Sequence, residues 1–589
     1  MKRITLLAII ILLLMMGSAH PQDFSKLLDG YFAYNRFWGS ILIVQNDKIL
    51  FQKSYGFADK DKKIKNDANT LFNLASVTKT MTASAIMKLH EEGKLTVYDR
   101  VDKYIPGFIN DDTKDIKIIN LLNHTSGIAA NFGQSDDQGK GMVKPGKEPI
   151  SLEQLIAKFK DTKLKNQPGT KFEYNNYAYT LLSYIIEKVS GMDYPTYLNK
   201  AIFSKAGMSN TFYKLNLTKK SAIGYEGIGT LNVRPVANDE HHPSWILGAS
   251  DIYSSTNDLA KYVRAEFTYQ ILSDKTVKMM LDTCVESRFP GVKWSLGWTK
   301  QTAGDLVWYA HSGNGDGFAT KIGYIPTKNI SIIILSNLVR DDRTEDIRST
   351  AYTFVEEIAE NAIKVINNKG LTYIPVPKGK ADKKICGKYK LDDSHFMNIS
   401  LQNDSLYLSA DSVTVFDYIY NKEITDNSNN VNVCKTLSTS FLTDNFDGFE
   451  KNATKDLQQG LFNKKGFGDL SGVWKYITSK SGKYQSYSIY DIKIRTGNTV
   501  YFMAFHFEKS DLLMELSFND EGLINGFFIT SILPKCMIQK INMVAVGKGE
   551  YFIDGYKYGG YKDYRIKFDI TQQTLNFSAE GDEFNAMKL

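Results

Sequence analysis

One short stretch restricts the possible folds of this chain more than any other feature. Ser76 and Lys79 form a Ser-x-x-Lys pair that opens a segment with apolar residues at helical spacing as far as Leu89, and Gly93 suits a left-handed helix end. Residues three apart share one helix face, so Ser76 and Lys79 should lie side by side. An amine next to a hydroxyl can help to deprotonate it, which predicts a nucleophile. Without partners elsewhere, Ser76 would be a plain helix cap.

Three downstream stretches supply candidate partners, namely residues 120–128, 167–176 and 311–315. The second is a loop that leads into a helix and carries Tyr174 and Asn176 as a Tyr-x-Asn pair. The third begins at His311, after one predicted strand, and leads into the next. Because the chain has 34 tyrosines, a Tyr-x-Asn pair alone would usually be coincidence. The specific signal is the order and spacing of all these stretches together with Ser76.

Together these motifs resemble the serine hydrolases of the class C β-lactamase and D-alanyl-D-alanine carboxypeptidase family, over residues 23 to 366. Shorter stretches also match in register, namely Gly207-Met208, Gly248-Ala249 to Asp258-Leu259, Leu296-Gly297-Trp298 and Leu335-Ser336-Asn337. The resemblance implies an α/β fold in which an antiparallel sheet is flanked by helices and joined to an all-α subdomain. It implies neither a metal nor another cofactor.

The resemblance also implies catalytic roles for three residues. Ser76 matches the acylated nucleophile, and Lys79 matches the cation that lowers the pKa of the neighbouring base. Tyr174 matches the tyrosine that acts as general acid and base. A tyrosine normally titrates near pH ~10, so we expect nearby cations to be needed before Tyr174 can act as a base.

Four further residues match positions that bind the substrate in the family. Asn176 would hold the substrate amide and Lys79. His311 and Gly313 match the third motif, on a strand beside the nucleophile. The backbone N–H groups of Ser76 and Asn314 would form an oxyanion hole, whose donors typically contribute ~3 kcal/mol each to the transition state.

The third motif departs from the β-lactamase branch, because His311 stands where that branch has a lysine. A histidine is mostly neutral near pH 7, so a substrate carboxylate should be held less firmly and efficient β-lactam hydrolysis is disfavoured. We expect discrimination between a free carboxylate and its ester to be modest at pH 8 and to grow toward pH 6, as His311 gains a proton.

Other polar stretches are given structural interpretations. In the family the block around His124 is structural, so this residue is expected to be a buried histidine that fixes a loop. Residues 239–242 contain two acidic residues and two histidines, but no distant ligand completes a metal site. The chain has no Gly-x-Ser-x-Gly elbow and no His-Glu-x-x-His motif, which disfavours other hydrolase classes.

The periodicity of the first 366 residues predicts strands at both ends with helices between them, which favours an α/β unit. Strands are expected at 39–45, 49–55, 306–311, 318–324 and 330–336. The clearest helices are expected at 23–34, 152–159, 179–189, 259–269 and 344–366.

The remainder of the chain has a different character. Residues 367–384, with two prolines and several lysines and glycines, are a predicted linker. Residues 385–589 read as an all-β region with alternating strands, either one barrel or two smaller units. The opening Ile-Cys-Gly-Lys-Tyr at 385–389 resembles lipocalin-like domains. Among Cys386, Cys434 and Cys536 one disulfide is conceivable, but free thiols are favoured.

The N-terminus predicts export. Lys2 and Arg3 precede an apolar run that ends at Met16, and small residues up to Ala19 offer a cleavage site for a signal peptide of residues 1–19. No other stretch approaches the length of a membrane span, so a periplasmic or secreted protein is expected, with the catalytic domain at 20–366. The formal charge of +7 is mild and scattered, and indicates no nucleic-acid partner.

The sequence therefore predicts a serine hydrolase that forms an acyl-enzyme on Ser76 and acts on a small peptide, ester or β-lactam. A D-amino-acid peptidase similar to the carboxypeptidases is favoured. An esterase or a slow β-lactamase is the alternative within the enzymes. A non-catalytic protein that binds β-lactams or wall fragments is the alternative from another class. The oligomeric state is not predicted.

Overall fold

A computed structural model describes residues 21–589 apart from 107–113, 130–144, 160–163, 215–220, 229–231, 237–240, 251, 288–290, 304, 341–353, 370, 372, 381, 392–395, 403–404, 411–428, 444, 456, 459–469, 496–497, 535–539, 554–563 and 580–581. The expected signal segment lies outside the described residues. The chain forms two compact units, and the boundary between Ile374 and Pro375 falls within the predicted linker. Each unit is described by itself.

The first unit is built around an antiparallel sheet of eight strands. In spatial order these are β10 (Val285–Glu286), β11 (Val292–Trp294), β12 (Thr299–Ala303), β13 (Leu306–Gly315), β14 (Phe318–Ile325), β15 (Ile330–Ser336), β1 (Gly39–Gln45) and β2 (Lys48–Tyr55). The two ends of the unit therefore meet in one sheet, because β1 pairs with β15 from Gly39 opposite Ser336 to Gln45 opposite Ile330. The predicted α/β fold and its five strands are confirmed.

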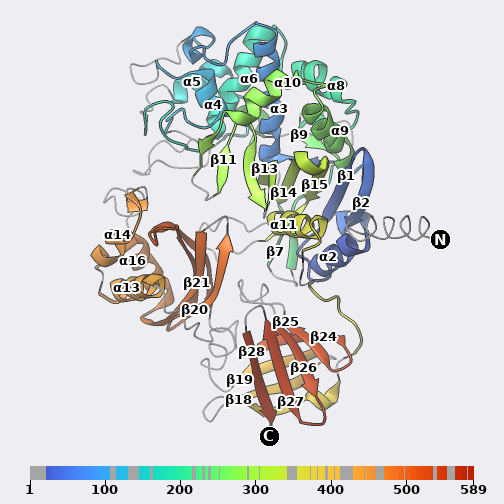
Figure 1. Cartoon of the computed structure of the whole chain (residues 1–589), viewed down its shortest axis with the longest axis vertical. Helices are drawn as coiled ribbons and strands as arrows, with labels where there is room; N and C mark the ends of the chain where they lie inside the picture. Colours follow the sequence, from blue (N-terminus) through green and yellow to red (C-terminus); the bar gives the residue numbers. More distant parts are fainter. Residues whose placement is uncertain are drawn as a thin grey trace, which may run out of the picture. The chain divides into compact units, whose positions relative to one another are not determined.

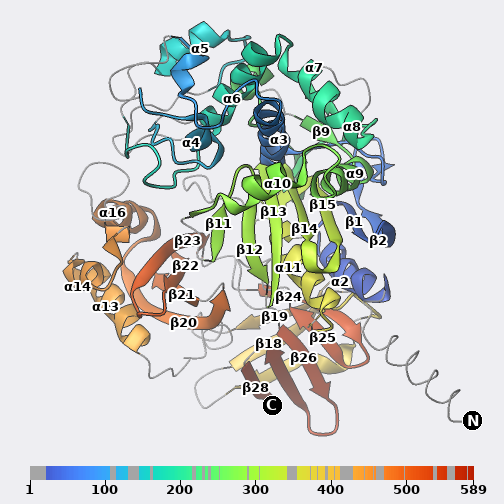
Figure 2. The ribbon, with the colours of Figure 1, turned by 45° about the horizontal axis from the view of Figure 1, so that its top comes forward.

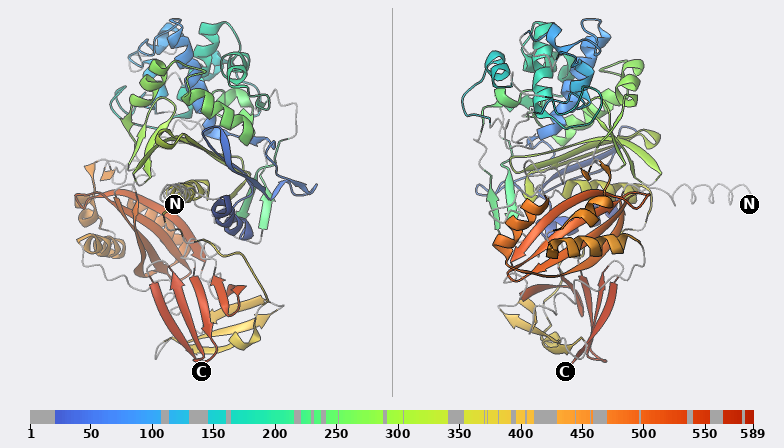
Figure 3. Two further views of the ribbon diagram at one scale, coloured as in Figure 1. Left: turned by 45° about the vertical axis from the view of Figure 1, so that its right-hand side comes forward. Right: turned by 90° about the vertical axis from the view of Figure 1, so that its left-hand side faces the viewer.

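The centre of the sheet is strongly apolar. Every residue of β14 and β15 is buried, which suits a run as rich in isoleucine as Ile330–Ser336. Such a sheet must be covered on both faces. Figure 3 shows the sheet with helices above and below it.

Helices from opposite ends of the unit cover one face of the sheet, namely α2 (Pro21–Ala33) and α11 (Phe354–Ile366). Both were predicted, although residues 344–353 of the second prediction lie outside the described residues. The helix α9 (Thr256–Phe267) packs on β1, β14 and β15, and belongs to the layer on the opposite side in Figure 3. These helices fix the sheet, and so the strand β13 that carries the third motif.

The helical layer surrounds the predicted nucleophile helix α3 (Thr78–Glu91), whose end is followed by Gly93 with φ +68°. Its companions are α4 (Ile118–Leu122), α5 (Leu152–Phe159), α6 (Asn176–Ser190), α7 (Tyr194–Leu198), α8 (Ser204–Ala206) and α10 (Asp274–Asp282). Figure 2 shows α3 among α6, α7 and α8. Eleven of its fourteen residues are buried, so α3 is a central helix rather than a surface one.

Three small sheets join the helical layer to the large sheet. They contain β3 (Phe57–Asp59) with β4 (Ile64–Lys65), then β5 (Phe72–Asn73), β9 (Ile252–Ser254) and β6 (Phe212–Tyr213), and finally β16 (Leu338–Arg340), β7 (Tyr225–Ile228) and β8 (Asn232–Pro235). The strand β5 matters most for function, because it ends two residues before the Ala75–Val77 turn of 3₁₀ helix that contains Ser76.

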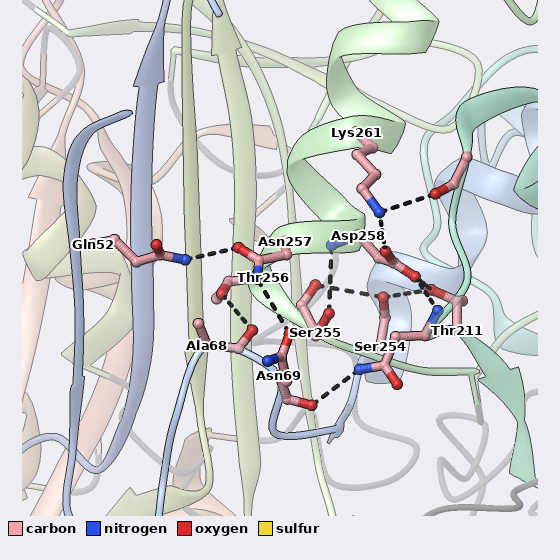
Figure 4. Close-up of polar contacts among 12 residues, drawn as sticks. Gln52, Ala68, Asn69, Thr211, Ser254, Ser255, Thr256, Asn257, Asp258 and Lys261 are labelled. Atoms are coloured by element: carbon pink, nitrogen blue, oxygen red, sulfur yellow. Dashed lines mark hydrogen bonds and ion pairs between the residues drawn. The ribbon is translucent and has the colours of Figure 1, made fainter. Parts of the chain in front are cut away.

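A polar network fixes β9 and the start of α9 (Figure 4). Thr211 Oγ1 lies 2.7 Å from Ser254 Oγ and donates to Asp258 Oδ2 at 3.1 Å, while Lys261 Nζ pairs with Asp258 Oδ1 at 2.9 Å. Asp258 is buried, so these donors and the charge of Lys261 offset its loss of hydration. Since β9 pairs with β5, the network also fixes the chain that leads to Ser76.

Behind α3 lies a buried carboxyl group. Glu266, on α9, accepts a hydrogen bond from Ser84 Oγ at 2.9 Å, and its second oxygen has no partner among the described residues. Burial raises the pKa of Glu266 from 4.5 to about 7. The folded state therefore keeps a proton that the unfolded state releases, so stability falls as pH rises from 4.5 to about 7 and stays level above it.

Replacing Glu266 with glutamine should remove this pH dependence. Between pH 5 and pH 8 the wild type should lose ~3 kcal/mol more unfolding free energy than Glu266→Gln, the amount that corresponds to its shift in pKa. Urea unfolding followed by tryptophan fluorescence measures this, since five of the six tryptophans lie in the first unit. An equal loss in both proteins would contradict a neutral buried Glu266.

The second unit contains a closed barrel of eight strands, which confirms the predicted barrel. Its strands are β17 (Gly387–Lys390), β18 (Phe396–Gln402), β19 (Ser405–Ala410), β24 (Lys540–Gly547), β25 (Glu550–Ile553), β26 (Tyr564–Asp569), β27 (Thr574–Ala579) and β28 (Asp582–Lys588). Figure 1 shows that the yellow strands from the start of this region and the red strands from its end form one barrel. Along β26 buried and exposed residues alternate, as a filled barrel requires.

The described residues between β19 and β24 form an inserted sheet with helices. The sheet consists of β20 (Tyr484–Arg495), β21 (Asn498–Phe507), β22 (Ser510–Phe518) and β23 (Ile524–Pro534). Its helices are α13 (Asn429–Thr443), α14 (Asp447–Lys451) and α16 (Leu470–Ser481). The helices were not predicted. They form because residues such as Leu437 and Trp474 bury their side chains against the sheet in one core.

No helix within the described part of the chain is long and apolar enough to cross a bilayer. Cys284, Cys386 and Cys434 are free thiols, and Cys536 lies outside the described residues. Among the described residues no group of three or more His, Cys, Asp or Glu could hold a metal ion, and Asp239 and Glu240 lie outside them.

Candidate active site

Ser76 lies in a tight turn between β5 and α3. The turn is anchored by the N–H of Leu74, which donates to Ile252 O at 2.8 Å, and by the side chain of Asn73, which accepts from the N–H of Ala75 at 2.8 Å. Ala75 has φ +45°, a conformation that costs a non-glycine residue of order 1 kcal/mol or more. The strained turn leaves the side chain of Ser76 partly exposed, although its neighbours are buried.

The structure brings the three predicted catalytic side chains together. Lys79 Nζ lies 3.0 Å from Ser76 Oγ, and Tyr174 Oη donates to Ser76 Oγ at 2.8 Å. Lys79 Nζ also donates to the backbone oxygen of Ala249 at 2.8 Å. The serine and lysine of the Ser-x-x-Lys pair do lie side by side on one helix face, and a tyrosine 98 residues away in sequence joins them.

The charges of this group differ from the expected ones. Lys79 is completely buried, and burial lowers its pKa well below the usual value of 10.5. Burial also raises the pKa of Tyr174, although the hydrogen bond with Ser76 opposes the rise. Burial therefore favours the uncharged form of both side chains, an amine and a phenol, whereas the sequence predicted a lysine cation beside a tyrosine that can lose its proton.

Two ring contacts favour the charged form of Lys79. The rings of Tyr174 and Tyr179 lie with their centroids 5.1 and 5.7 Å from Nζ, within range for cation–π attraction. Such attraction contributes ~1–2 kcal/mol, whereas removing an unpaired ammonium from water costs several. The described residues place no carboxylate in an ion pair with Lys79, so desolvation is the larger effect and lowers the pKa of the amine.

The second motif begins a helix. Asn175 caps α6, since its side-chain oxygen accepts from the N–H of Ala178 at 2.9 Å and its amide donates to Ile128 O at 3.0 Å. Tyr174 immediately precedes this cap and Asn176 is the first residue of α6. The predicted Tyr-x-Asn pair therefore brackets a buried asparagine that the motif itself does not include.

The third motif lies at the end of β13, next to the turn that contains Ser76. A Cβ atom on Gly313 would stand 2.2 Å from Leu74 O and 3.0 Å from Ser76 N, so only glycine allows this approach. Asn314 follows in the same strand, opposite Ala319 of β14. The arrangement puts the end of β13 beside the backbone N–H of Ser76, as an oxyanion hole would need.

His311 is buried and neutral. Its Nδ1–H donates to Ser312 O at 2.7 Å, which leaves Nε2 as a lone-pair acceptor without a partner among the described residues. Burial is the main cause that lowers the pKa of His311, to about 3. The expectation that His311 titrates between pH 6 and pH 8 is therefore wrong, because the sequence did not reveal its burial.

An ion pair fixes the face of β13 that carries Ser312, which is opposite the face that carries His311. Lys321 Nζ, buried on β14, donates to Ser312 Oγ at 3.0 Å and pairs with Glu356 Oε2 of α11 at 2.8 Å. Ser312 Oγ in turn donates to the second oxygen of Glu356. This cluster binds β13 to its helix and keeps a charged lysine away from the catalytic group.

Two contributors to the site were not predicted. Trp294 packs its ring against Tyr174 and His311, with centroids 5.4 Å from each, and no spacing in the sequence marks it. The second is Ala249, whose backbone oxygen accepts a hydrogen bond from Lys79. The sequence stretch that contains Ala249 was noted as a family match, but this role was not predicted. His124 is buried and bound to the loop of Tyr174, so the expected loop-fixing histidine is confirmed.

Comparison with known proteins gives a consistent result. Residues 24–354 match the family described as Beta-lactamase. Protein flp of Staphylococcus aureus is 32% identical over 308 residues, which are 51% of this chain and 59% of that protein. The chain therefore spans about three fifths of the length of these relatives. The putative penicillin-binding protein PbpX of Bacillus subtilis is 30% identical over 337 residues, 57% of this chain and 79% of that protein.

Solved structures share the fold. The D-amino acid amidase from Ochrobactrum anthropi SV3, complexed with D-phenylalanine, is 22% identical with a TM-score of 0.51, over 59% of this chain and 98% of that one. The octameric penicillin-binding protein homologue from Pyrococcus abyssi is 22% identical with a TM-score of 0.50, over 83% of this chain and 93% of that one. The second likeness covers more of the chain than the 24–354 match and so extends into the second unit.

Proposed function

The chain belongs to the beta-lactamase family, and from this membership and the hydrogen bonds of Ser76 we propose that it is a serine hydrolase that works through an acyl-enzyme. The observation that carries the proposal is that Ser76 Oγ lies within hydrogen-bond distance of two groups, one that can accept a proton and one that can donate a proton. Lys79 can take a proton from Ser76 Oγ, and Tyr174 can donate one. The favoured substrates are amides or esters of a D-amino acid or short peptide.

Acylation uses the neutral states of both groups. The Ser76 hydroxyl donates to the lysine amine, which takes its proton as Oγ attacks the substrate carbonyl. When the tetrahedral intermediate collapses, Tyr174 gives its proton to the leaving amine or alcohol, and the ammonium of Lys79 returns a proton to Tyr174. The net change is one bond from carbon to the leaving group broken and one ester bond to Ser76 formed.

Deacylation follows the same path in reverse, with water as the nucleophile. Lys79 again accepts a proton, this time from water by way of the tyrosine hydroxyl, and Ser76 Oγ recovers its own as it departs. The N–H groups of Ser76 and Asn314 would bind the oxyanion in both halves of the reaction. Asn176 would hold the substrate amide.

Three alternatives use the same residues. An efficient β-lactamase is disfavoured because a neutral His311 offers no charge to the carboxylate of a β-lactam. A non-catalytic binding protein is disfavoured because it would not need a buried lysine amine 3.0 Å from the hydroxyl of a partly exposed serine. An esterase would use every step above unchanged.

A substrate panel tests the proposal. D-alanine amide, a D-alanyl dipeptide, its methyl ester and a chromogenic cephalosporin should be incubated with the wild type and with Ser76→Ala. We expect turnover of the amide or ester that depends on Ser76, and slower turnover of the cephalosporin. Stoichiometric labelling without turnover of any substrate would favour the binding protein.

His311 gives a prediction about pH. His311 remains uncharged between pH 6 and pH 8. Its titration should therefore not change the ratio of kcat/KM for a D-alanyl dipeptide to kcat/KM for the methyl ester of that dipeptide over this range. His311→Lys should shift the ratio toward the free acid by ~1–2 kcal/mol, or roughly 5- to 30-fold, as a charge-assisted hydrogen bond does. A wild-type preference for the acid that rises toward pH 6 and is lost in His311→Gln would contradict a neutral His311.

We also propose that the protein is exported, on the basis of the apolar N-terminal run. The match of residues 385–389 to lipocalin-like domains remains a prediction.

A further inference from the structure

His124 contacts three successive residues around the proposed proton donor. Its backbone oxygen accepts the N–H of Glu173 at 2.7 Å, and its ring Nδ1 accepts the N–H of Asn175 at 3.1 Å. Its ring lies against the ring of Tyr174, with centroids 4.4 Å apart and planes 34° apart. Tyr174 is therefore held through the residue before it, the residue after it and its own ring.

These contacts require a particular conformation of His124. Its φ is +59°, which is unfavourable for a residue with a side chain and persists only where the surroundings enforce it. The surroundings do so, because Gly169 N–H donates to Thr125 O at 2.8 Å and Lys165 N–H donates to Gly127 O at 2.8 Å. The loop of His124 is thus bound along its length to the loop that leads to Tyr174.

The contacts also require the neutral form of His124. Its Nδ1 accepts a hydrogen bond, so the single ring proton is on Nε2, where no partner is found among the described residues. A charged ring would carry protons on both nitrogens and would lose the bond from Asn175. Complete burial disfavours that state and lowers the pKa of His124.

We propose that His124 is a positioning residue for Tyr174, and that it sets how well the tyrosine hydroxyl protonates the leaving group. The inference rests on the proposed function, in which Tyr174 is the proton donor. His124 makes no direct contact with Ser76, so its effect must pass through the orientation of the phenol. A displacement of ~1 Å of a catalytic group can lower a rate by up to ~100-fold.

The test compares two substrates with the same acyl group, a D-alanyl amide and its p-nitrophenyl ester. The amide needs a proton on its leaving nitrogen, whereas p-nitrophenolate leaves without one. His124→Asn keeps an acceptor near the position of Nδ1 and tolerates positive φ, but loses the ring against Tyr174. We expect kcat/KM for the amide to fall ~10- to 50-fold and that for the ester to change less than ~3-fold.

The ratio of the two rates is independent of the folded fraction, because the same molecules turn over both substrates. Phe172→Leu is the control: Phe172 packs against His124, at 5.8 Å between centroids, but has no described ring contact with Tyr174, so the ratio should stay as in the wild type. In a Tyr174→Phe background, His124→Asn should lower the amide rate no further.

Three results would overturn the proposal. They are an equal loss for both substrates, a ratio that also changes in Phe172→Leu, and additive losses in the double variant. Each leaves the proposed function intact. Activity that survives Ser76→Ala would instead refute the proposed function itself, so the two failures can be distinguished.

Discussion

Replacing Ser76 with alanine should lower kcat/KM for the amide or ester substrate on the order of 10⁴- to 10⁶-fold, the effect of removing a catalytic serine. Ser76 is partly exposed, and within the described part of the chain its side chain makes hydrogen bonds to Lys79 and Tyr174 only. The substitution should therefore change the free energy of unfolding by no more than about 1 kcal/mol. Steady-state kinetics and thermal unfolding on the same sample measure both quantities.

The matched control is Ser84→Ala, eight residues further along α3. Ser84 donates to Thr80 O and to Glu266, and none of its hydrogen bonds among the described residues reaches Ser76, Lys79 or Tyr174. Its loss should lower stability and leave kcat/KM within about threefold. If the two variants lost activity equally, the effect would come from α3 as a whole and not from Ser76.

Replacing Lys79 with methionine should lower kcat/KM ~10²- to 10⁴-fold, the range for loss of a general base. Methionine fills a similar volume in the buried site without an amine. In the wild type, kcat/KM should rise with pH through the pKa of the Lys79 amine, which burial places well below 10.5. In Lys79→Met this limb of the profile of log kcat/KM against pH should disappear.

Lys79→Arg separates the two possible roles of the residue. Arginine keeps a positive charge at every accessible pH and cannot act as a base. If Lys79 works as the amine, the arginine variant should be as inactive as the methionine variant. Activity above about a tenth of the wild type in Lys79→Arg would show that a cation is what the site needs.

The first unit could be predicted well because its signals are local and repeated. The hairpin of β1 and β2 has apolar runs on either side of Asn46 and Asp47, both of which adopt positive φ in the turn. The helix α5 runs from Leu152 to Phe159, as its apolar spacing indicates. The three motifs meet at one site because each lies where a helix begins or a strand ends. That helix or strand fixes the direction of the motif's side chains.

The second unit was predicted less completely. The barrel strands alternate clearly, whereas α13 is a run of Asn, Thr and Ser with few strong helix formers. Its helical form depends on burial of Val433 and Leu437 against the inserted sheet, which no local pattern reveals. Tertiary packing overrides propensity here.

The charges at the site could not be predicted for a related reason. A sequence shows that a lysine, a tyrosine and a histidine are present, but their pKa values depend on how far water is excluded. Lys79 and His311 are both buried, and this burial lowers the pKa of each, which for His311 removes the expected titration between pH 6 and pH 8. The contacts of Trp294 with Tyr174 and His311 likewise arise only when the sheet has folded.

The most direct test of the central claim is to find the residue that becomes acylated. The full chain should be incubated with a fluorescent penicillin and with an activated D-alanyl ester, quenched in acid and digested, and the labelled peptide analysed by mass spectrometry. The proposed mechanism predicts a single adduct on the peptide that contains Ser76, and none in Ser76→Ala. An adduct on any other residue, or one that persists in Ser76→Ala, would contradict it.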